Sequence, residues 1–222
     1  MDEVPAGLGR PRAVLFDWDN TLVDNWAVIH DAMNATLVAM GQAPWSLDEA
    51  KTRVRASMRD SFPRLFGARW PEARRIYYDT FAATHLARLR EMPGAGTMLA
   101  GLAGAGLYLG VVSNKQGRFL RLEAERLGWT GHFGRLVGAT DAARDKPAVD
   151  PVELALTDSG IAPGAAVWFV GDADIDMLCA INAGCVPVLL RAAPPASGEF
   201  ADAAPVCHVP SCAALAALIG RP

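Results

Sequence analysis

The residues best suited to chemistry form a short acidic pair near the start of the chain. Asp17 and Asp19 directly follow the apolar segment of residues 13–16 and are separated by Trp18. Side chains two residues apart on an extended chain face the same way, so both carboxylates should point together and Trp18 away from them. Two converging carboxylates at the end of a buried strand are costly unless a cation or a shared proton separates their charges. The pair therefore predicts a site that holds a cation or a proton.

Further polar residues occur later in the chain, each close to the end of an apolar segment or to a helix start. They are Ser113, Asn114 and Lys115, then Lys146, and finally Asp172 and Asp176. Taken singly, each has an ordinary explanation, because Asp caps helices, Ser and Asn populate loops, and a lone Lys is usually a solvated surface charge. For Lys115 and Asp174 that ordinary explanation is sufficient. The full set, in this order, instead predicts one joint site.

The charges of this set indicate a metal ion. The ionisable groups are Asp17, Asp19, Asp172 and Asp176 against Lys146. Four carboxylates and one ammonium group leave a charge of about −3 if all of them ionise. Such a cluster requires a divalent cation, and an oxygen-rich site suits Mg²⁺. We therefore expect Mg²⁺ as the cofactor.

Short apolar segments alternate with helical patterns along most of the chain, which is typical of an α/β fold. The expected strands are residues 13–16, 107–112, 135–138, 166–170 and 185–190. Most are nearly continuous in apolar residues, as strands covered on both faces of a parallel sheet should be. The expected helices are residues 98–105, 116–127 and 212–219, one after Asp174 that ends at Gly184, and one that starts with Asp150 as N-cap and Pro151 at its first position and closes at Gly160.

One segment interrupts this alternation. Roughly seventy residues between the first expected strand and Pro93 show helical patterns only. Apolar residues recur there at spacings of three and four, as in Trp26, Ile29, Met33, Leu37 and Met40, and again in Trp70, Ala73, Tyr77 and Phe81. A helical block inserted after the first strand lies beside the carboxyl ends of the strands. We therefore predict a core domain of residues 1–22 and 92–222, and a helical cap of residues 23–91 that acts as a lid.

The composition excludes several classes of protein. The 222 residues are 51% apolar and 20% charged, far from a disordered composition, and the net charge of −3 gives no attraction to nucleic acid or to an anionic membrane. No apolar run approaches the roughly 18 residues of a spanning helix, and the first ten residues lack the apolar stretch of a secretory signal. The four cysteines are interpreted as core or loop residues rather than as disulfides or metal ligands. We expect a soluble, cytoplasmic protein whose partner is a small molecule.

The chain resembles the haloacid dehalogenase-like (HAD) hydrolases, in particular the helical-cap subgroup that contains phosphoglycolate phosphatases. The resemblance covers nearly the whole chain and rests on four motifs in order, namely Asp17-Trp18-Asp19-Asn20-Thr21-Leu22, Ser113-Asn114-Lys115, Lys146-Pro147, and Gly171-Asp172 with Asp176 and Ala183-Gly184. The segment from Pro93-Gly94 to Gly106 is also similar to that subgroup. Asn20 stands where the family commonly has Gly, a change that removes no catalytic group. The resemblance implies a doubly wound, Rossmann-like parallel sheet with an inserted helical cap.

The resemblance also implies catalytic roles. Asp17 would attack the phosphorus of a phosphate monoester and form an aspartyl-phosphate. Asp19 would protonate the departing alkoxide and then deprotonate the water that hydrolyses the intermediate. Ser113 and Asn114 would bind the phosphoryl oxygens, and Lys146 would neutralise their charge.

The metal ligands implied by the resemblance are the Asp17 carboxylate, the Asp19 backbone carbonyl and Asp172, which would hold Mg²⁺. Asp176 would orient the water ligands of the metal or Lys146. The implied activity is Mg²⁺-dependent hydrolysis of a small phosphorylated metabolite, as in a phosphoglycolate phosphatase.

Several alternatives stay open at this point. Asp19 favours phosphate esters, because dehalogenases similar to this chain usually carry Tyr at that position and phosphonate-cleaving members carry Ala. It does not separate hydrolysis from phosphoryl transfer, as in a β-phosphoglucomutase-like enzyme. A receiver-like phospho-switch also gathers acidic residues and a Lys around Mg²⁺, but it needs no cap and lacks an acid like Asp19. A binding protein with a decayed site is disfavoured because the catalytic set is intact.

Arginines in the inserted segment are candidates for substrate selection. Residues 51–92 hold more basic than acidic side chains, which a solvated helix face explains in most cases. Arg59 is the first choice for a contact with the non-phosphate end of the substrate and Arg55 the second, because Ser57-Met58-Arg59 lies where the cap of the subgroup usually turns toward the site. The sequence leaves the substrate and the oligomeric state open.

Overall fold

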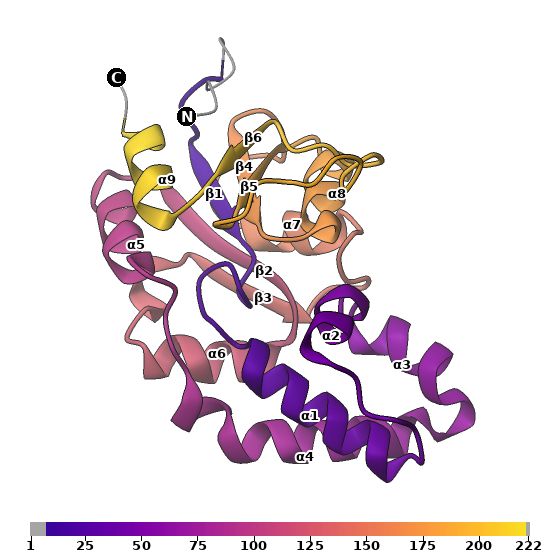
Figure 1. Cartoon of the computed structure of the whole chain (residues 1–222). Coiled ribbons are helices and arrows are strands. Elements are labelled where there is room, and N and C mark those ends of the chain that lie inside the picture. Colours follow the sequence, from indigo (N-terminus) through magenta and orange to yellow (C-terminus); the bar gives the residue numbers. More distant parts are fainter. Residues whose placement is uncertain (1–7, 221–222) are drawn as a thin grey trace. The chain divides into compact units, whose positions relative to one another are not determined.

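The computed structural model describes residues 8–220, and its contacts divide the chain into two compact units (Figure 1). The larger unit runs up to Val23 and resumes at Glu91, and the smaller unit is Asp24–Arg90. Within the described range, the structure has no helix that is both long enough and apolar enough to cross a bilayer.

The larger unit is built on a six-stranded sheet in the order β3-β2-β1-β4-β5-β6. The strands are β1 (Ala13–Phe16), β2 (Tyr108–Gln116), β3 (Arg135–Ala139), β4 (Val167–Gly171), β5 (Val186–Leu190) and β6 (Cys207–Val209). All five pairings are parallel. The strand order reverses between β1 and β4, so the sheet has its topological switch point there. This confirms the predicted doubly wound α/β fold.

Helices cover the sheet of the larger unit. They are α5 (Ala95–Gly104), α6 (Gly117–Arg126), α7 (Asp150–Leu156), α8 (Asp174–Asn182) and α9 (Cys212–Ile219), with a 3-10 turn at Thr130–His132. Figure 1 shows α5 and α9 on one side of the sheet and α7 and α8 on the other. All four residues of β1 are completely buried, as the continuous apolar segment predicted.

Several details differ from the sequence predictions. Strand β2 continues to Gln116, beyond its predicted end at residue 112, and α6 begins after it. Strand β6 is short and partly polar at the sheet edge, so its residues lack the apolar pattern that marks the other strands. Helix α7 begins at Asp150 with Val149 as N-cap, so the predicted capping role of Asp150 is wrong; its carboxylate instead lies 2.8 Å from the Arg144 guanidinium. The same helix ends at Leu156, before Gly160, because Thr157 takes an extended ψ and Asp158 a positive φ.

The smaller unit consists of helices. They are α1 (Trp26–Ala39), α2 (Leu47–Arg53), α3 (Met58–Phe66) and α4 (Trp70–Arg88), with a 3-10 turn at Gly67–Arg69. The predicted apolar faces of α1 and α4 supply Met33, Leu37 and Ala73 to a core that also contains Phe62 and Phe66 from α3. The smaller unit therefore has a hydrophobic cluster of its own.

Candidate active site

The carboxyl ends of the central strands bring the sequence-predicted residues together. Asp17 directly follows β1, Asp172 directly follows β4, and Ser113 lies in the second half of β2. Because β1 is hydrogen-bonded to both β2 and β4 in parallel, these positions share one edge of the sheet. Doubly wound sheets bind their ligands at this edge, beside the switch point.

An acidic cluster forms at this edge. One carboxylate oxygen each from Asp17, Asp172 and Asp176 lies within 4.8 Å of the others. The Thr21 hydroxyl donates to Asp172 Oδ1 at 3.2 Å, and the Ala173 backbone N–H donates to Asp176 Oδ2 at 3.0 Å. The second of these contacts is a cap at the N-terminus of α8, which explains why Asp176 points back toward the strand end.

Crowding of buried carboxylates changes their protonation. Burial raises the pKa of Asp172 well above its ordinary value, and the negative charges of Asp176 and Asp17 raise it further. Burial also raises the pKa of Asp176, to about 6, although the positive charge of Lys146 opposes the shift. Both shifts show that negative charge is disfavoured at these buried positions.

Lys146 is the cation of the cluster. Its side chain is 2% exposed, and its Nζ lies 2.7 Å from Asp176 Oδ1 and 2.8 Å from Asp17 Oδ1. Burial alone would lower the pKa of Lys146, but the charges of Asp17 and Asp176 outweigh burial and raise it. The lysine therefore stays protonated at neutral pH.

Asp17 Oδ1 is a buried oxygen of this cluster whose hydrogen-bonding capacity is not fully used. The atom is buried and forms an ion pair with Lys146, and apart from that ammonium no group of residues 8–220 donates a hydrogen bond to it. Three carboxylates against one ammonium group still leave negative charge in excess, and all of the donors are oxygens. This donor set suits a hard divalent cation such as Mg²⁺.

Asn114 connects β2 to the loop that carries Lys146. Its Nδ2 donates to the Lys146 carbonyl at 3.3 Å, and the Lys146 backbone N–H donates to its Oδ1 at 3.1 Å. Both ends of the amide therefore hold the lysine loop, a contact that the sequence did not suggest. Ser113 Oγ accepts the Lys115 backbone N–H at 3.3 Å, which leaves the hydroxyl proton to donate elsewhere. Phosphate binding by Ser113 and Asn114 stays a prediction.

The interpretation of Lys115 as a solvated surface charge is wrong. Its side chain is 4% exposed, and its Nζ lies 2.6 Å from Asp19 Oδ1 and 3.0 Å from Glu123 Oε2. Burial lowers the pKa of Lys115, but the two carboxylates outweigh burial and raise it. The two catalytic candidates at the end of β1 therefore pair with different lysines, Asp17 with Lys146 and Asp19 with Lys115.

Sequence reasoning missed Glu123. This residue lies on α6 and is completely buried, and its Oε2 accepts a 2.7 Å hydrogen bond from Trp18 Nε1. Trp18 is itself fully buried and packs edge-on against Trp129 and Phe133. A signal was available, because Phe119, Leu120 and Glu123 share the spacing of one helix face, so a carboxylate falls in line with core residues.

The remaining predicted residues lie outside this cluster. Asp174 is exposed in the first turn of α8, where a carboxylate is ordinary. Arg55 and Arg59 are half-buried in the smaller unit, Arg59 in the first turn of α3 and Arg55 with its Nε 3.5 Å from the Thr52 carbonyl. Contact of either arginine with a substrate stays a prediction.

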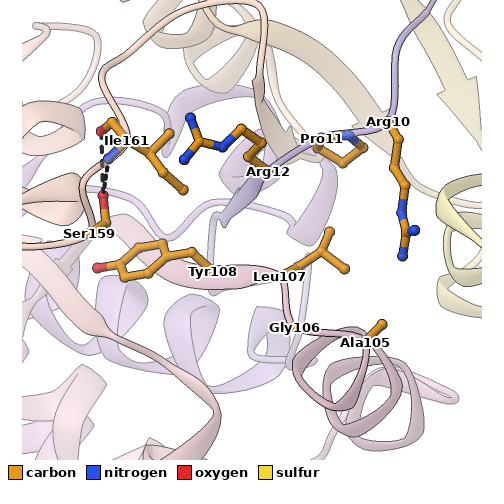
Figure 2. Close-up of a pocket in the computed structure, with 9 residues that line it drawn as sticks. All are labelled: Arg10, Pro11, Arg12, Ala105, Gly106, Leu107, Tyr108, Ser159 and Ile161. Carbon is orange, nitrogen blue, oxygen red and sulfur yellow. Dashed lines mark hydrogen bonds between the residues drawn. The ribbon is translucent and has the colours of Figure 1, made fainter.

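A hollow of about 490 Å³ lies at the opposite edge of the sheet. Figure 2 shows its lining, which comes from the segments leading into the amino ends of β1 and β2 and from the turn after α7. Arg10, Arg12 and Tyr108 are its largest side chains. None of the acidic cluster contributes to it, so this hollow is separate from the chemistry described above.

Comparison with known proteins identifies the family. A sequence model of the family described as haloacid dehalogenase-like hydrolase matches residues 14–189. The chain is 32% identical to a phosphoglycolate phosphatase of Xylella fastidiosa, with 83% of this chain and 81% of that protein covered. It is 33% identical to an N-acetylmuramic acid 6-phosphate phosphatase of Pseudomonas aeruginosa, with 82% of each covered. A solved haloacid dehalogenase-like family hydrolase from Streptococcus pneumoniae has the same fold, with a TM-score of 0.80 at 21% identity, over 94% of this chain and 98% of that one. The resemblance seen in the motifs is confirmed, and the chain belongs to the haloacid dehalogenase-like hydrolase family.

Proposed function

We propose that this protein is a Mg²⁺-dependent phosphatase that hydrolyses a small phosphate monoester through an aspartyl-phosphate on Asp17. The observation that carries the proposal is Asp17 Oδ1, which is buried and has the Lys146 ammonium, 2.8 Å away, as its only donor among residues 8–220. An oxygen with a single donor keeps a lone pair for attack, and the adjacent cation favours a phosphate dianion there. The phosphatase names of the two relatives support the same chemistry.

The metal would be held by the Asp17 carboxylate, Asp172 and the backbone carbonyl of Asp19. When bound, Mg²⁺ would supply positive charge that lets a phosphate approach the carboxylates. Asp176 would instead orient Lys146, because its Oδ1 contacts Lys146 Nζ at 2.7 Å.

The residues of the chain divide the reaction into two steps. In the first, an Asp17 carboxylate oxygen bonds to phosphorus, the bond to the ester oxygen breaks, and Asp19 donates its proton to the departing alkoxide. In the second, Asp19 takes a proton from a water molecule whose oxygen attacks the same phosphorus. The bond between phosphorus and the Asp17 oxygen breaks, inorganic phosphate leaves, and both aspartates return to their starting states.

The substrate is proposed as a class. The two relatives are named for different phosphate esters, phosphoglycolate and N-acetylmuramic acid 6-phosphate, at nearly equal identity to this chain. We infer that the smaller unit, within residues 23–91, is a cap that selects the substrate, with Arg59 and then Arg55 as its first candidates. We also propose that the enzyme is soluble and cytoplasmic and that it acts there on a phosphorylated metabolite.

A turnover assay tests the function. Wild-type protein should release inorganic phosphate from an aryl phosphate with Mg²⁺, lose that activity in EDTA, and regain it when Mg²⁺ is restored. Asp17→Asn should abolish turnover and stay folded, because the amide is nearly isosteric but far less nucleophilic. Asp174→Asn, an exposed change two residues beyond Asp172, is the matched control and should retain activity.

Two results would contradict the proposal. Full activity of the metal-free protein would exclude a catalytic metal at the acidic cluster. Near wild-type activity of Asp17→Asn would exclude Asp17 as the nucleophile. Transfer of the phosphoryl group to a second hydroxyl without phosphate release would instead identify a phosphotransferase. A panel that includes 2-phosphoglycolate and N-acetylmuramic acid 6-phosphate would identify the substrate.

A further inference from the structure

A second charged network lies behind Asp19, separate from the acidic cluster. Glu123 is completely buried on α6, and a buried carboxylate is costly unless it is paired. Its Oε2 contacts two donors, Lys115 Nζ at 3.0 Å and Trp18 Nε1 at 2.7 Å. Lys115 then contacts Asp19 Oδ1 at 2.6 Å. A single oxygen on α6 is thus connected to Asp19 through one intermediate side chain.

The network reaches Asp19 by two routes. Through space, Lys115 connects Glu123 to the carboxylate of Asp19. Through the chain, Trp18 connects Glu123 to the backbone between Asp17 and Asp19. Trp18 is further fixed by its packing in the core. The backbone position and the side-chain rotamer of Asp19 therefore depend on one buried carboxylate.

We propose that Glu123 is a positioning residue for Asp19, acting through Lys115 and Trp18. This inference rests on the proposed function, in which Asp19 must protonate the leaving oxygen. Proton transfer requires the donor within hydrogen-bond reach of its acceptor, so an error of about 1 Å in the carboxylate lowers the rate by about a hundredfold. The side chain of Asp19 keeps 18% exposure, so it can meet a substrate while its other face contacts Lys115.

A role in stability alone would produce a different result. Replacing part of a buried charge network changes folding free energy, which lowers the concentration of active enzyme equally for every substrate. Misplacing an acid affects only substrates whose leaving group needs a proton. An aryl phosphate releases a stabilised phenolate and depends little on the acid, whereas an alkyl phosphate releases a basic alkoxide and depends strongly on it.

The test compares kcat/KM for these two kinds of substrate. The ratio kcat/KM reports only steps up to departure of the leaving group, so the later hydrolysis of the aspartyl-phosphate does not enter. Glu123→Gln keeps the size and an acceptor for Trp18 but removes the charge that faces Lys115. The matched control is Glu125→Gln, two residues along the same helix and exposed.

We expect Glu123→Gln to lower kcat/KM for the alkyl phosphate by about tenfold to a hundredfold and for the aryl phosphate by less than about threefold. Glu125→Gln should change neither. Lys115→Met, which retains the apolar stem and removes only the ammonium, should show the same selective loss, and Lys115→Arg should recover part of the alkyl activity. Lys115→Met also serves as the test if Glu123→Gln does not fold.

The outcomes separate the two proposals. If wild-type enzyme cleaves both phosphates but the folded variants lose both activities equally, or lose neither, the positioning role is overturned and the proposed function stands. If wild-type enzyme cleaves neither phosphate with Mg²⁺, the proposed function and the positioning role both fall. A selective loss of activity on the alkyl phosphate supports both the positioning role of Glu123 and the proposed function.

Discussion

Replacing Lys146 with Met should damage both the stability and the activity of the enzyme. The side chain is buried, and its Nζ contacts Asp17 at 2.8 Å and Asp176 at 2.7 Å. Methionine fills a similar volume without the charge, so the change leaves two buried carboxylates without their cation.

The magnitude follows from these distances. At an effective dielectric constant of about 20, each contact corresponds to roughly 6 kcal/mol of Coulomb energy. Much of that energy offsets desolvation of the three groups, so removing the lysine alone should cost about 3–5 kcal/mol of folding free energy. For a unit of this size the melting temperature should fall by roughly 6–20 °C. Loss of the charge that faces the phosphoryl group should lower kcat by about 10²–10³-fold.

The pH dependence of this loss provides a sharper test. Burial raises the pKa of Asp176 to about 6 even though the charge of Lys146 opposes the shift, so this pKa should rise further in the variant. A carboxyl group with a raised folded-state pKa takes up its proton as the pH falls, and its unpaired charge then disappears. The stability deficit of the variant should therefore shrink between pH 7 and pH 5.

Urea unfolding of metal-free wild type and variant at several pH values measures the deficit. Lys51→Met, a half-buried lysine on α2, is the control and should change stability by less than about 0.5 kcal/mol at every pH. A deficit that stays constant from pH 7 to pH 5, or that grows, would refute the assignment of Lys146 as the counter-charge of Asp176.

Three further predictions concern the same site and the smaller unit. Metal-free wild type should lose roughly 2 kcal/mol of stability relative to Asp176→Asn as the pH rises from 3.8 to about 6, because the folded state holds the Asp176 proton to higher pH than the unfolded chain. Urea titrations with and without Mg²⁺ measure this loss, which Mg²⁺ should reduce. Gly171→Ala should lower the folding stability by about 1–3 kcal/mol and also lower activity, since an added Cβ would meet the Asp176 side chain. Gly101→Ala, with open space around it, is the control and should lower neither quantity in melting and turnover assays. Arg59→Ala should lower kcat/KM for the true substrate by roughly ten- to a hundredfold and hardly change kcat/KM for an aryl phosphate. If kcat/KM stays near the wild-type value for both substrates, Arg59 belongs to a solvated surface.

The sequence alone was sufficient for the fold class and for the residues at the strand ends. Strand β1 reads as a continuous apolar segment because both of its faces are covered, and Asp17 is fixed at its end by the covalent chain. Parallel strands end at one edge, so the positions after β1 and β4 meet without further information. Asp17 and Asp172 could be named because each follows such a strand, whereas Lys146 lies in the loop between β3 and α7 and was named from its place before a predicted helix start and from the family motif.

Only the tertiary structure determined which groups contact each other. Lys115 looked like a surface charge because no acidic residue lies within seven positions of it in the sequence. Its partners Asp19 and Glu123 are brought to it by the pairing of β2 with β1 and by the placement of α6. Glu123 and Trp18 are 105 residues apart, and a pattern of local spacing carries no information about such a pair. A buried charge is tolerated only where its counter-charge lies, and that place is set by how helices pack on the sheet.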